Sequence, residues 1–158
     1  MRVDVRGAAA ADQPTIIALV RQARLNPRHL HWARFVVAEH RGEVIGVAQV
    51  RRYPDGAREL ASLVVQPGQR GHGVAAAMID RLLADETGEV YALIDRRYVA
   101  HFRRWAFAPV VPSELPRSVR RVFRVGRVIT GLASVLRREQ IRIVPLRRAS
   151  RQVTNRPG

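Results

Sequence analysis

The chain has 158 residues, of which 47% are hydrophobic, and this length and composition predict one globular domain with a packed core. It contains no cysteine, which excludes disulfides, cysteine-ligated metals and thiol nucleophiles; its five histidines lack metal-ligand spacing, so we expect no bound metal. All 28 basic residues are arginine and they outnumber 13 acidic residues, so the net charge of +15 favours polyanionic partners such as nucleic acid or an acidic protein.

The N-terminal part of the chain predicts a strand and then a helix. Residues 3–6 have the composition of a short strand, and Asp12 is placed to cap a helix that carries Pro14 in its first turn and ends near Asn26. The chain begins without an apolar run, carrying Asp4 instead, and no segment approaches the roughly 20 apolar residues of a membrane span. We therefore expect a soluble, cytoplasmic protein.

Three strands are expected next. Residues 35–39 and 44–50 are apolar and flank the turn at residues 41–42, which predicts a hairpin. Residues 54–56, Pro-Asp-Gly, form a second strong turn. Residues 60–65 follow and are nearly all apolar, which predicts a central strand.

A glycine-rich loop joins this strand to the next helix and carries the strongest functional signal. Arg70, Gly73 and Ala75 occur in the order Arg-x-x-Gly-x-Ala, and an apolar helix begins at Val74. Glycines let the backbone approach a ligand, and the unpaired N–H groups of a helix N-terminus attract anions. The loop lacks the Gly-Lys-Ser/Thr of a P-loop and the spacing of the dinucleotide fingerprint. The pattern predicts a pyrophosphate site, and the alternative is an ordinary strand–turn–helix.

The second half of the chain predicts further strands around a short helix. Residues 90–94 read as a buried strand, 98–104 as a short helix and 107–111 as the start of another strand. Residues 141–144 form the expected last strand. Pro145 predicts that this strand lies at a sheet edge, where it could pair with a second subunit in a homodimer.

Residues 112–140 form a basic segment between the last two strands. Its arginines recur on one helical face, while Gly126 and Gly131 favour two short helices as much as one. One interpretation is a solvated face of a helix that packs on the sheet. The other is a docking surface for an acidic protein, RNA or a membrane surface. Residues 147–158 are polar and basic and are predicted to be a disordered tail.

The loop sequence resembles the acetyl-CoA-binding motif of the GNAT superfamily of N-acetyltransferases, Arg/Gln-x-x-Gly-x-Gly/Ala. The order of the expected elements resembles this family over residues 3–111, and the whole chain is similar to a bacterial and plant-type group within it. The resemblance implies a mixed α/β fold with a mostly antiparallel sheet flanked by helices. It also implies splayed central strands with acetyl-CoA in the gap, and a single domain over residues 1–146.

The resemblance places the cofactor on the central strand and the loop. The strand backbone would pair with the pantetheine arm and polarise the acetyl carbonyl, and the loop amides would hold the pyrophosphate. For the loop histidine, a solvent-facing position is the alternative to a ligand contact. The expected cofactor-binding residues are Leu63, Val64, Val65, Arg70, Gly71, His72, Gly73, Val74, Ala75 and Phe102.

Glu59 and Tyr98 are the expected catalytic residues. Glu59 opens the cofactor strand, where family members carry a general base that acts directly or through water; the alternative is an exposed glutamate paired with Arg58. The family pattern Tyr-x-x-x-Gly-Phe has Phe102 in place of tyrosine and Ala106 in place of glycine, so the usual proton donor is missing. Tyr98 lies one helical turn earlier and is either the general acid or a packed tyrosine.

The function implied is that of an N-acetyltransferase, which moves an acetyl group from acetyl-CoA, as co-substrate, to a primary amine of a small molecule, peptide or protein. One alternative is a catalytically weak acetyl-CoA-binding module that engages an acidic partner or RNA through its arginine-rich segment. Another is a nucleic-acid-binding protein, although the chain carries no zinc-finger or ribonucleoprotein motif.

Overall fold

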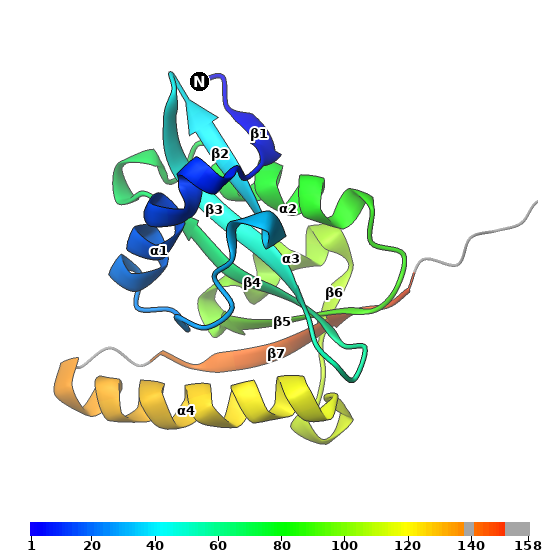
Figure 1. Cartoon of the computed structure of the whole chain (residues 1–158). Helices are drawn as coiled ribbons and strands as arrows, with labels where there is room; N and C mark the ends of the chain where they lie inside the picture. Colours follow the sequence, from blue (N-terminus) through cyan, green and yellow to red (C-terminus); the bar gives the residue numbers. More distant parts are fainter. Residues whose placement is uncertain (138–140, 151–158) are drawn as a thin grey trace, which may run out of the picture. The chain divides into compact units, whose positions relative to one another are not determined.

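A computed structural model of the chain describes residues 1–137 and 141–150, with side chains described as far as residue 127 in the last helix. The described residues contain seven β-strands, which pair mostly antiparallel, and four α-helices. This confirms the predicted mixed α/β class (Figure 1). The chain divides into two compact units. The first unit contains residues 1–51 and 60–86, and the second contains residues 52–59 together with the chain from residue 87 onward.

The first unit contains four strands in the order β1-β2-β3-β4 and two helices. These elements are β1 (Asp4–Gly7), α1 (Gln13–Gln22), β2 (Phe35–His40), β3 (Glu43–Arg52), β4 (Arg58–Val65) and α2 (Val74–Ala84). β1 and β3 both pair antiparallel with β2, and the β2–β3 register shifts between Ala38 and Glu39. The predicted N-terminal strand and hairpin are confirmed, as is the helix with Pro14 in its first turn. Its predicted end near Asn26 is wrong, since α1 ends at Gln22, and the Asp12 side chain makes no capping hydrogen bond to it.

The two helices of the first unit pack on opposite faces of its strands, because side chains alternate along a strand. In β2, Val37 joins the buried cluster that α1 fills with Ile16 and Val20. Its neighbour Val36 joins a separate cluster with Met78 of α2. Each face of the sheet is therefore buried by one helix.

Gly46 of β3 allows α2 to pack closely. A Cβ atom at this position would lie 2.9 Å from the Met78 side chain and 3.1 Å from the Val64 carbonyl oxygen. Glycine in a strand interior often marks such a close approach. This contact fixes the start of α2 beside the end of β4, where the glycine loop connects them.

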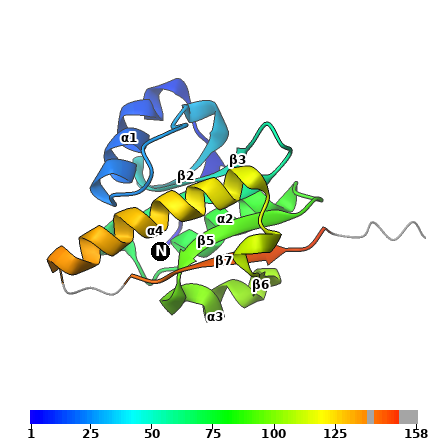
Figure 2. The ribbon, with the colours of Figure 1, turned by 90° about the horizontal axis from the view of Figure 1, so that it is seen from below.

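The second unit contains three strands in the order β5-β7-β6 and two helices. These elements are β5 (Val90–Asp95), α3 (Val99–Phe102), β6 (Phe107–Pro109), α4 (Arg117–Arg137) and β7 (Ile143–Arg148). α4 runs alongside β7 (Figures 1 and 2), and it packs through Val119 and Phe123 on Tyr91 and Ala57. The predicted basic insertion is therefore one helix rather than two.

Two expectations about the last strand are wrong. β7 pairs with β5 on one side and with β6 on the other, so it is not an edge strand and is not available to pair with a second subunit. Pro145 lacks an N–H group, but its carbonyl oxygen accepts a hydrogen bond from Val110 at 3.0 Å, so the proline costs the sheet only one donor. Arg147 and Arg148, expected in the tail, are the last residues of β7; the rest of the predicted tail from residue 151 lies outside the described residues.

No helix in the described part of the chain is long and apolar enough to span a bilayer.

Candidate active site

The glycine loop lies between β4 and α2, as predicted. A short 3₁₀ turn at Pro67–Gln69 follows β4, and Gly71 and Gly73 then adopt left-handed backbone conformations with φ of +81° and +78°. Glycine adopts this region without the steric penalty that a Cβ atom brings. The loop thus turns sharply into α2, whose first residue Val74 is buried.

The N-terminus of α2 is uncapped. Gly73 is the N-cap residue and has no side chain to accept a hydrogen bond, and the first turn contains no acidic residue. Among the residues that the structure describes, none accepts a hydrogen bond from the backbone N–H groups of 73–76. Space is also open around the loop, since a Cβ atom on Gly71 or Gly73 would meet nothing within 4 Å. Free donors, a helix dipole and open space together make an anion site.

Two further side chains of the loop are exposed. Arg70 Nε donates a hydrogen bond to the Val65 carbonyl oxygen at 3.2 Å, which folds the guanidinium back along the end of β4. His72 Nδ1 lies 3.4 Å from the carbonyl oxygen of Gln69. Both residues belong to the loop, whereas Ala75 lies in the first turn of α2, directly after the loop.

β4 is not a regular strand, which the sequence did not indicate. Ser62 has a φ of +53° and is buried, and its hydroxyl accepts a hydrogen bond from Gln49 Nε2 at 3.1 Å. A non-glycine residue in this conformation costs on the order of 1–3 kcal/mol and often marks a functional site. The expected pantetheine strand, with Leu63, Val64 and Val65, begins directly after this irregularity.

Glu59 is buried at the start of β4, with an exposed fraction of 4%. The hydroxyl of Tyr53 donates a hydrogen bond to its carboxylate. The alternative of an exposed glutamate is therefore wrong. Sequence reasoning missed Tyr53, which directly follows β3 at the start of the predicted turn at residues 54–56.

Tyr98 and Phe102 have different surroundings in the second unit. Tyr98 is 55% exposed just before α3, and the Arg97 guanidinium lies 5.8 Å from the centre of its ring. Phe102 is buried and packs edge-to-face against Trp105 and Phe107, with ring centroids 5.8 and 5.6 Å away. Tyr98 is therefore accessible to a ligand, whereas the Phe102 ring belongs to an aromatic cluster.

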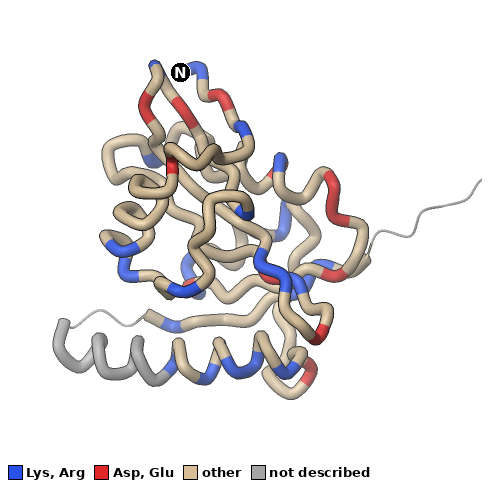
Figure 3. Tube along the Cα trace, in the orientation of Figure 1, with Lys and Arg blue, Asp and Glu red and all other residues tan. Residues whose placement is uncertain are grey.

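Arginines recur along the described part of α4 (Figure 3). Arg120 donates hydrogen bonds to the carbonyl oxygens of Ser113 and Leu115 at 2.6 and 2.8 Å, which fixes the segment before the helix. Arg117, Arg121 and Arg124 are exposed. Within residues 1–137 and 141–150, no three histidine, aspartate or glutamate side chains gather as a metal site would require.

Solved structures with the same fold include acetyltransferases bound to coenzyme A. N-acetylglutamate synthase from Neisseria gonorrhoeae, complexed with coenzyme A and N-acetyl-glutamate, matches 96% of this chain with a TM-score of 0.70 and 22% identity. The chain spans only 36% of that synthase. Rv2747 from Mycobacterium tuberculosis, in complex with CoA and NLQ, has a TM-score of 0.69 and 22% identity over 92% of this chain and 98% of its own.

A third structure is more distant in sequence. Diaminobutyrate acetyltransferase EctA from Paenibacillus lautus, in complex with L-2,4-diaminobutyric acid and coenzyme A, has a TM-score of 0.59 and 14% identity. The match covers 92% of this chain and 93% of EctA. Residues 9–100, more than half of the chain, match the Acetyltransferase (GNAT) family, so this protein belongs to the GNAT family of acyltransferases.

Proposed function

We propose that this protein transfers the acetyl group of acetyl-CoA to the primary amine of a small molecule. The observation that carries the proposal is the uncapped N-terminus of α2. No described residue accepts a hydrogen bond from the N–H groups of 73–76, and space is open around the two left-handed glycines Gly71 and Gly73. A pyrophosphate needs several converging donors, and this arrangement supplies them without any side chain. Membership of the GNAT family and the coenzyme A bound by the similar structures support the same cofactor.

In the proposed reaction, the amine nitrogen attacks the thioester carbonyl carbon. A C–N bond forms, the C–S bond breaks, the amine loses one proton and the leaving thiolate gains one. Main-chain N–H groups of β4 would stabilise the oxyanion that forms on the carbonyl oxygen. The left-handed conformation of Ser62 supports this assignment, because strained backbone of this kind clusters at functional sites.

We assign the proton transfers to Glu59 and Tyr98. Glu59 accepts the amine proton through a water molecule, since its carboxylate is buried and already bonded to Tyr53. Tyr98 protonates the thiolate, and its exposure permits contact with a ligand. A thiol with a pKa of about 8.5 is a fair leaving group, so the acid contributes less than positioning of the reactants does.

The amino-acid ligands of the similar structures support a small acceptor. The Neisseria synthase holds N-acetyl-glutamate and EctA holds L-2,4-diaminobutyric acid. Both ligands carry a carboxylate beside the nitrogen-bearing carbon. An amino acid or a close derivative is therefore the first class of acceptor to test.

The proposal is tested with Gly73→Glu, which puts a bulky negative side chain at the expected pyrophosphate site. Acetyl-CoA at 100 times its Kd should stabilise the native protein by about 2.7 kcal/mol, and the variant should lose this stabilisation. Gly42→Glu is the matched control, because Gly42 has a φ of +80° and equally open surroundings but lies in the β2–β3 turn. An undiminished thermal shift in Gly73→Glu would remove the loop from the proposal.

A further inference from the structure

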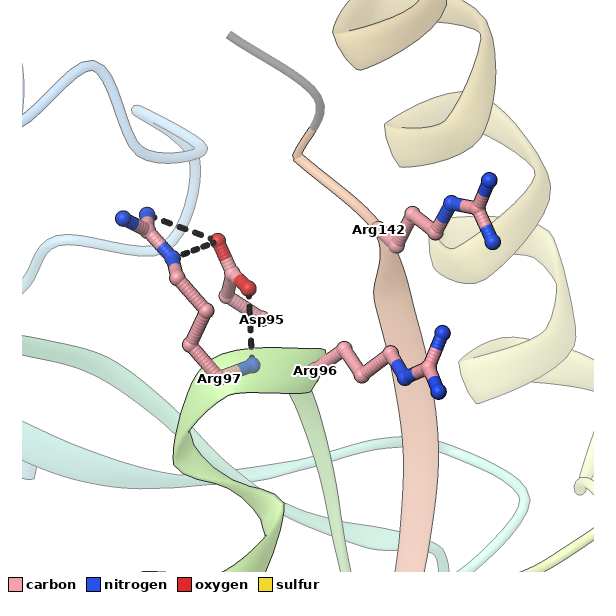
Figure 4. A pocket seen from close by; sticks show the side chains of 4 residues that line it. All are labelled: Asp95, Arg96, Arg97 and Arg142. Atoms are coloured by element: carbon pink, nitrogen blue, oxygen red, sulfur yellow. Dashed lines mark hydrogen bonds and ion pairs between the residues drawn. The ribbon is translucent and has the colours of Figure 1, made fainter.

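A cavity of about 510 Å³ lies where β5 ends and β7 approaches (Figure 4). Four residues line it: Asp95, Arg96, Arg97 and Arg142. The lining therefore holds three guanidinium groups and one carboxylate. All four residues belong to the second unit.

The single carboxylate that lines the cavity, Asp95, is already bonded to Arg97. One oxygen of Asp95 accepts a hydrogen bond from the Arg97 backbone N–H at 3.0 Å, and the other lies 2.9 Å from Arg97 Nη2 and 3.1 Å from Nε. Burial alone would raise the pKa of Asp95, but these bonds hold it below its ordinary value. Asp95 and Arg97 thus neutralise each other, and the remaining guanidiniums keep their charge.

Arg96 and Arg142 are opposite each other on neighbouring chain segments. The Arg96 N–H donates a hydrogen bond to the Arg142 carbonyl oxygen at 2.8 Å, which continues the β5–β7 register one step beyond the pair Asp95 and Ile143. Directly opposite side chains lie on one face, and like charges there are destabilising. Both side chains extend to the same side, away from the Asp95–Arg97 pair (Figure 4).

No acidic side chain that the structure describes compensates this pair. Among the side chains described, those of residues 1–127 and 141–150, none forms a hydrogen bond or ion pair with the side chain of Arg96 or Arg142. Two adjacent guanidiniums with free donors match the planar, bidentate geometry of a carboxylate. Binding such an anion would also relieve the repulsion within the pair.

We propose that Arg96 and Arg142 bind the carboxylate of the acetyl acceptor, so that the acceptor is an amine that also carries a carboxylate. This inference rests on the proposed function. Tyr98, the proposed general acid, follows Arg96 by two residues and is exposed beside it. A carboxylate held by the pair would therefore anchor the acceptor next to the residue that acts on the leaving thiolate.

The first test compares amino acids with their carboxamides, which keep the amine but lose the negative charge. Thiol release from acetyl-CoA is measured with the twenty amino acids, their α-carboxamides and simple alkyl amines. The native protein should prefer acids. Arg96→Ala and Arg142→Ala should each raise KM for acids about 10- to 100-fold, the range of hydrogen bonds to charged groups, with kcat little changed and KM for carboxamides unchanged. Arg121→Ala is the control, since it removes an exposed arginine of the same unit.

A second test separates this inference from the proposed function, because it needs no turnover. Binding of N-acetyl-L-glutamate and of inorganic phosphate is followed by isothermal titration in the native protein and in Arg142→Ala, alongside acetyl-CoA. Loss of N-acetyl-L-glutamate binding with retained acetyl-CoA binding supports the carboxylate site. The same loss in a protein that turns over no amine would support the site while overturning the proposed function.

Three results would overturn the inference. The native protein could use carboxamides and acids equally well as acetyl acceptors. Arg142→Ala could weaken the binding of acetyl-CoA rather than that of N-acetyl-L-glutamate, which would show that the arginine pair contacts a phosphate of the cofactor. A lower melting temperature of the ligand-free variants, instead of the equal or higher one expected after relief of repulsion, would indicate a structural role.

Discussion

The carboxylate of Asp55 caps a helix that begins more than sixty residues later in the chain. It accepts hydrogen bonds from the backbone N–H and the hydroxyl of Ser118 at 3.1 and 2.9 Å, and Ser118 lies in the first turn of α4. Asp55 also accepts a bond from the Ala57 N–H within the β3–β4 turn. One side chain therefore joins that turn to the N-terminus of α4.

Replacing Asp55 with alanine should destabilise the protein by about 1 kcal/mol, the usual effect of losing an N-cap. The pKa of Asp55 is lowered, chiefly by the hydrogen bond from the Ser118 N–H. The stabilisation by this carboxylate is therefore complete above the pKa of an ordinary aspartate and is lost as the pH falls through the lower folded value. Urea unfolding at pH 7 and pH 3 measures both effects. Asp4→Ala is the control, because Asp4 forms only a highly exposed ion pair with Arg2. Equal losses in the two variants would contradict the capping role.

A more buried carboxylate should dominate the acid sensitivity of the first unit. Arg6 donates to both oxygens of Asp12, at 2.7 and 3.2 Å, and the Ala9 N–H adds a third bond at 2.7 Å. The Arg6 guanidinium holds the pKa of Asp12 below its usual range. Stability from this group is therefore complete above about pH 4, the unfolded value, and is lost as pH falls through the lower folded value.

Asp12→Asn should cost about 2 kcal/mol at pH 7, since charged hydrogen bonds contribute about 1.5–3 kcal/mol. The variant should also lose less stability than the native protein between pH 4 and pH 2. Chemical denaturation of both proteins between pH 4 and pH 2 measures this difference in stability loss. A native protein and variant with parallel pH profiles would show that Asp12 does not carry the effect.

Local patterns predicted most elements of this fold, because turns and alternation act over few residues. The turns at residues 41–42 and 54–56 separate the strands as expected, and the glycine loop begins α2 at Val74. The place of the last strand was not predictable in this way. Its position between β5 and β6 depends on pairing across the chain, and Pro145 misleads because its carbonyl still bonds to Val110.

The candidate site shows the same division. The loop glycines were predictable because their spacing encodes a backbone conformation, which the φ angles of Gly71 and Gly73 confirm. The pairing of Arg96 with Arg142 was not, since it arises from a register between distant segments. The strain at Ser62 had no signal either, because serine is unremarkable in a strand until its conformation is known.

Ser62 gives a test of that strain. Ser62→Gly should change stability by less than about 1 kcal/mol, because relief of the left-handed conformation offsets loss of the Gln49 hydrogen bond. Ser62→Val should destabilise by about 2 kcal/mol or more, since a branched side chain is poorly tolerated at positive φ and the Gln49 amide loses one of its two acceptors, keeping only the His29 carbonyl oxygen. Urea unfolding of both variants decides this, and equal stability of the two would show that Ser62 adopts an ordinary strand conformation in solution.

Tyr53 provides the sharpest test of Glu59 as the general base. The tyrosine hydroxyl donates to the buried carboxylate, and such a bond favours the ionised form that a base requires. Tyr53→Phe removes the donor, so the acid limb of the kcat/KM profile should move to higher pH. Activity should then fall more at low pH than at high pH. The variant should also lose about 1–2 kcal/mol of stability.

The matched control is Tyr91→Phe, which removes another tyrosine–glutamate hydrogen bond of the second unit, at 3.0 Å to Glu89, outside the proposed site. Its pH profile should coincide with that of the native protein even if its stability falls. A destabilised Tyr53→Phe with an unmoved acid limb would assign Glu59 a structural role. The base would then have to be sought elsewhere, because a proton acceptor whose environment changes must change the pH at which the reaction slows.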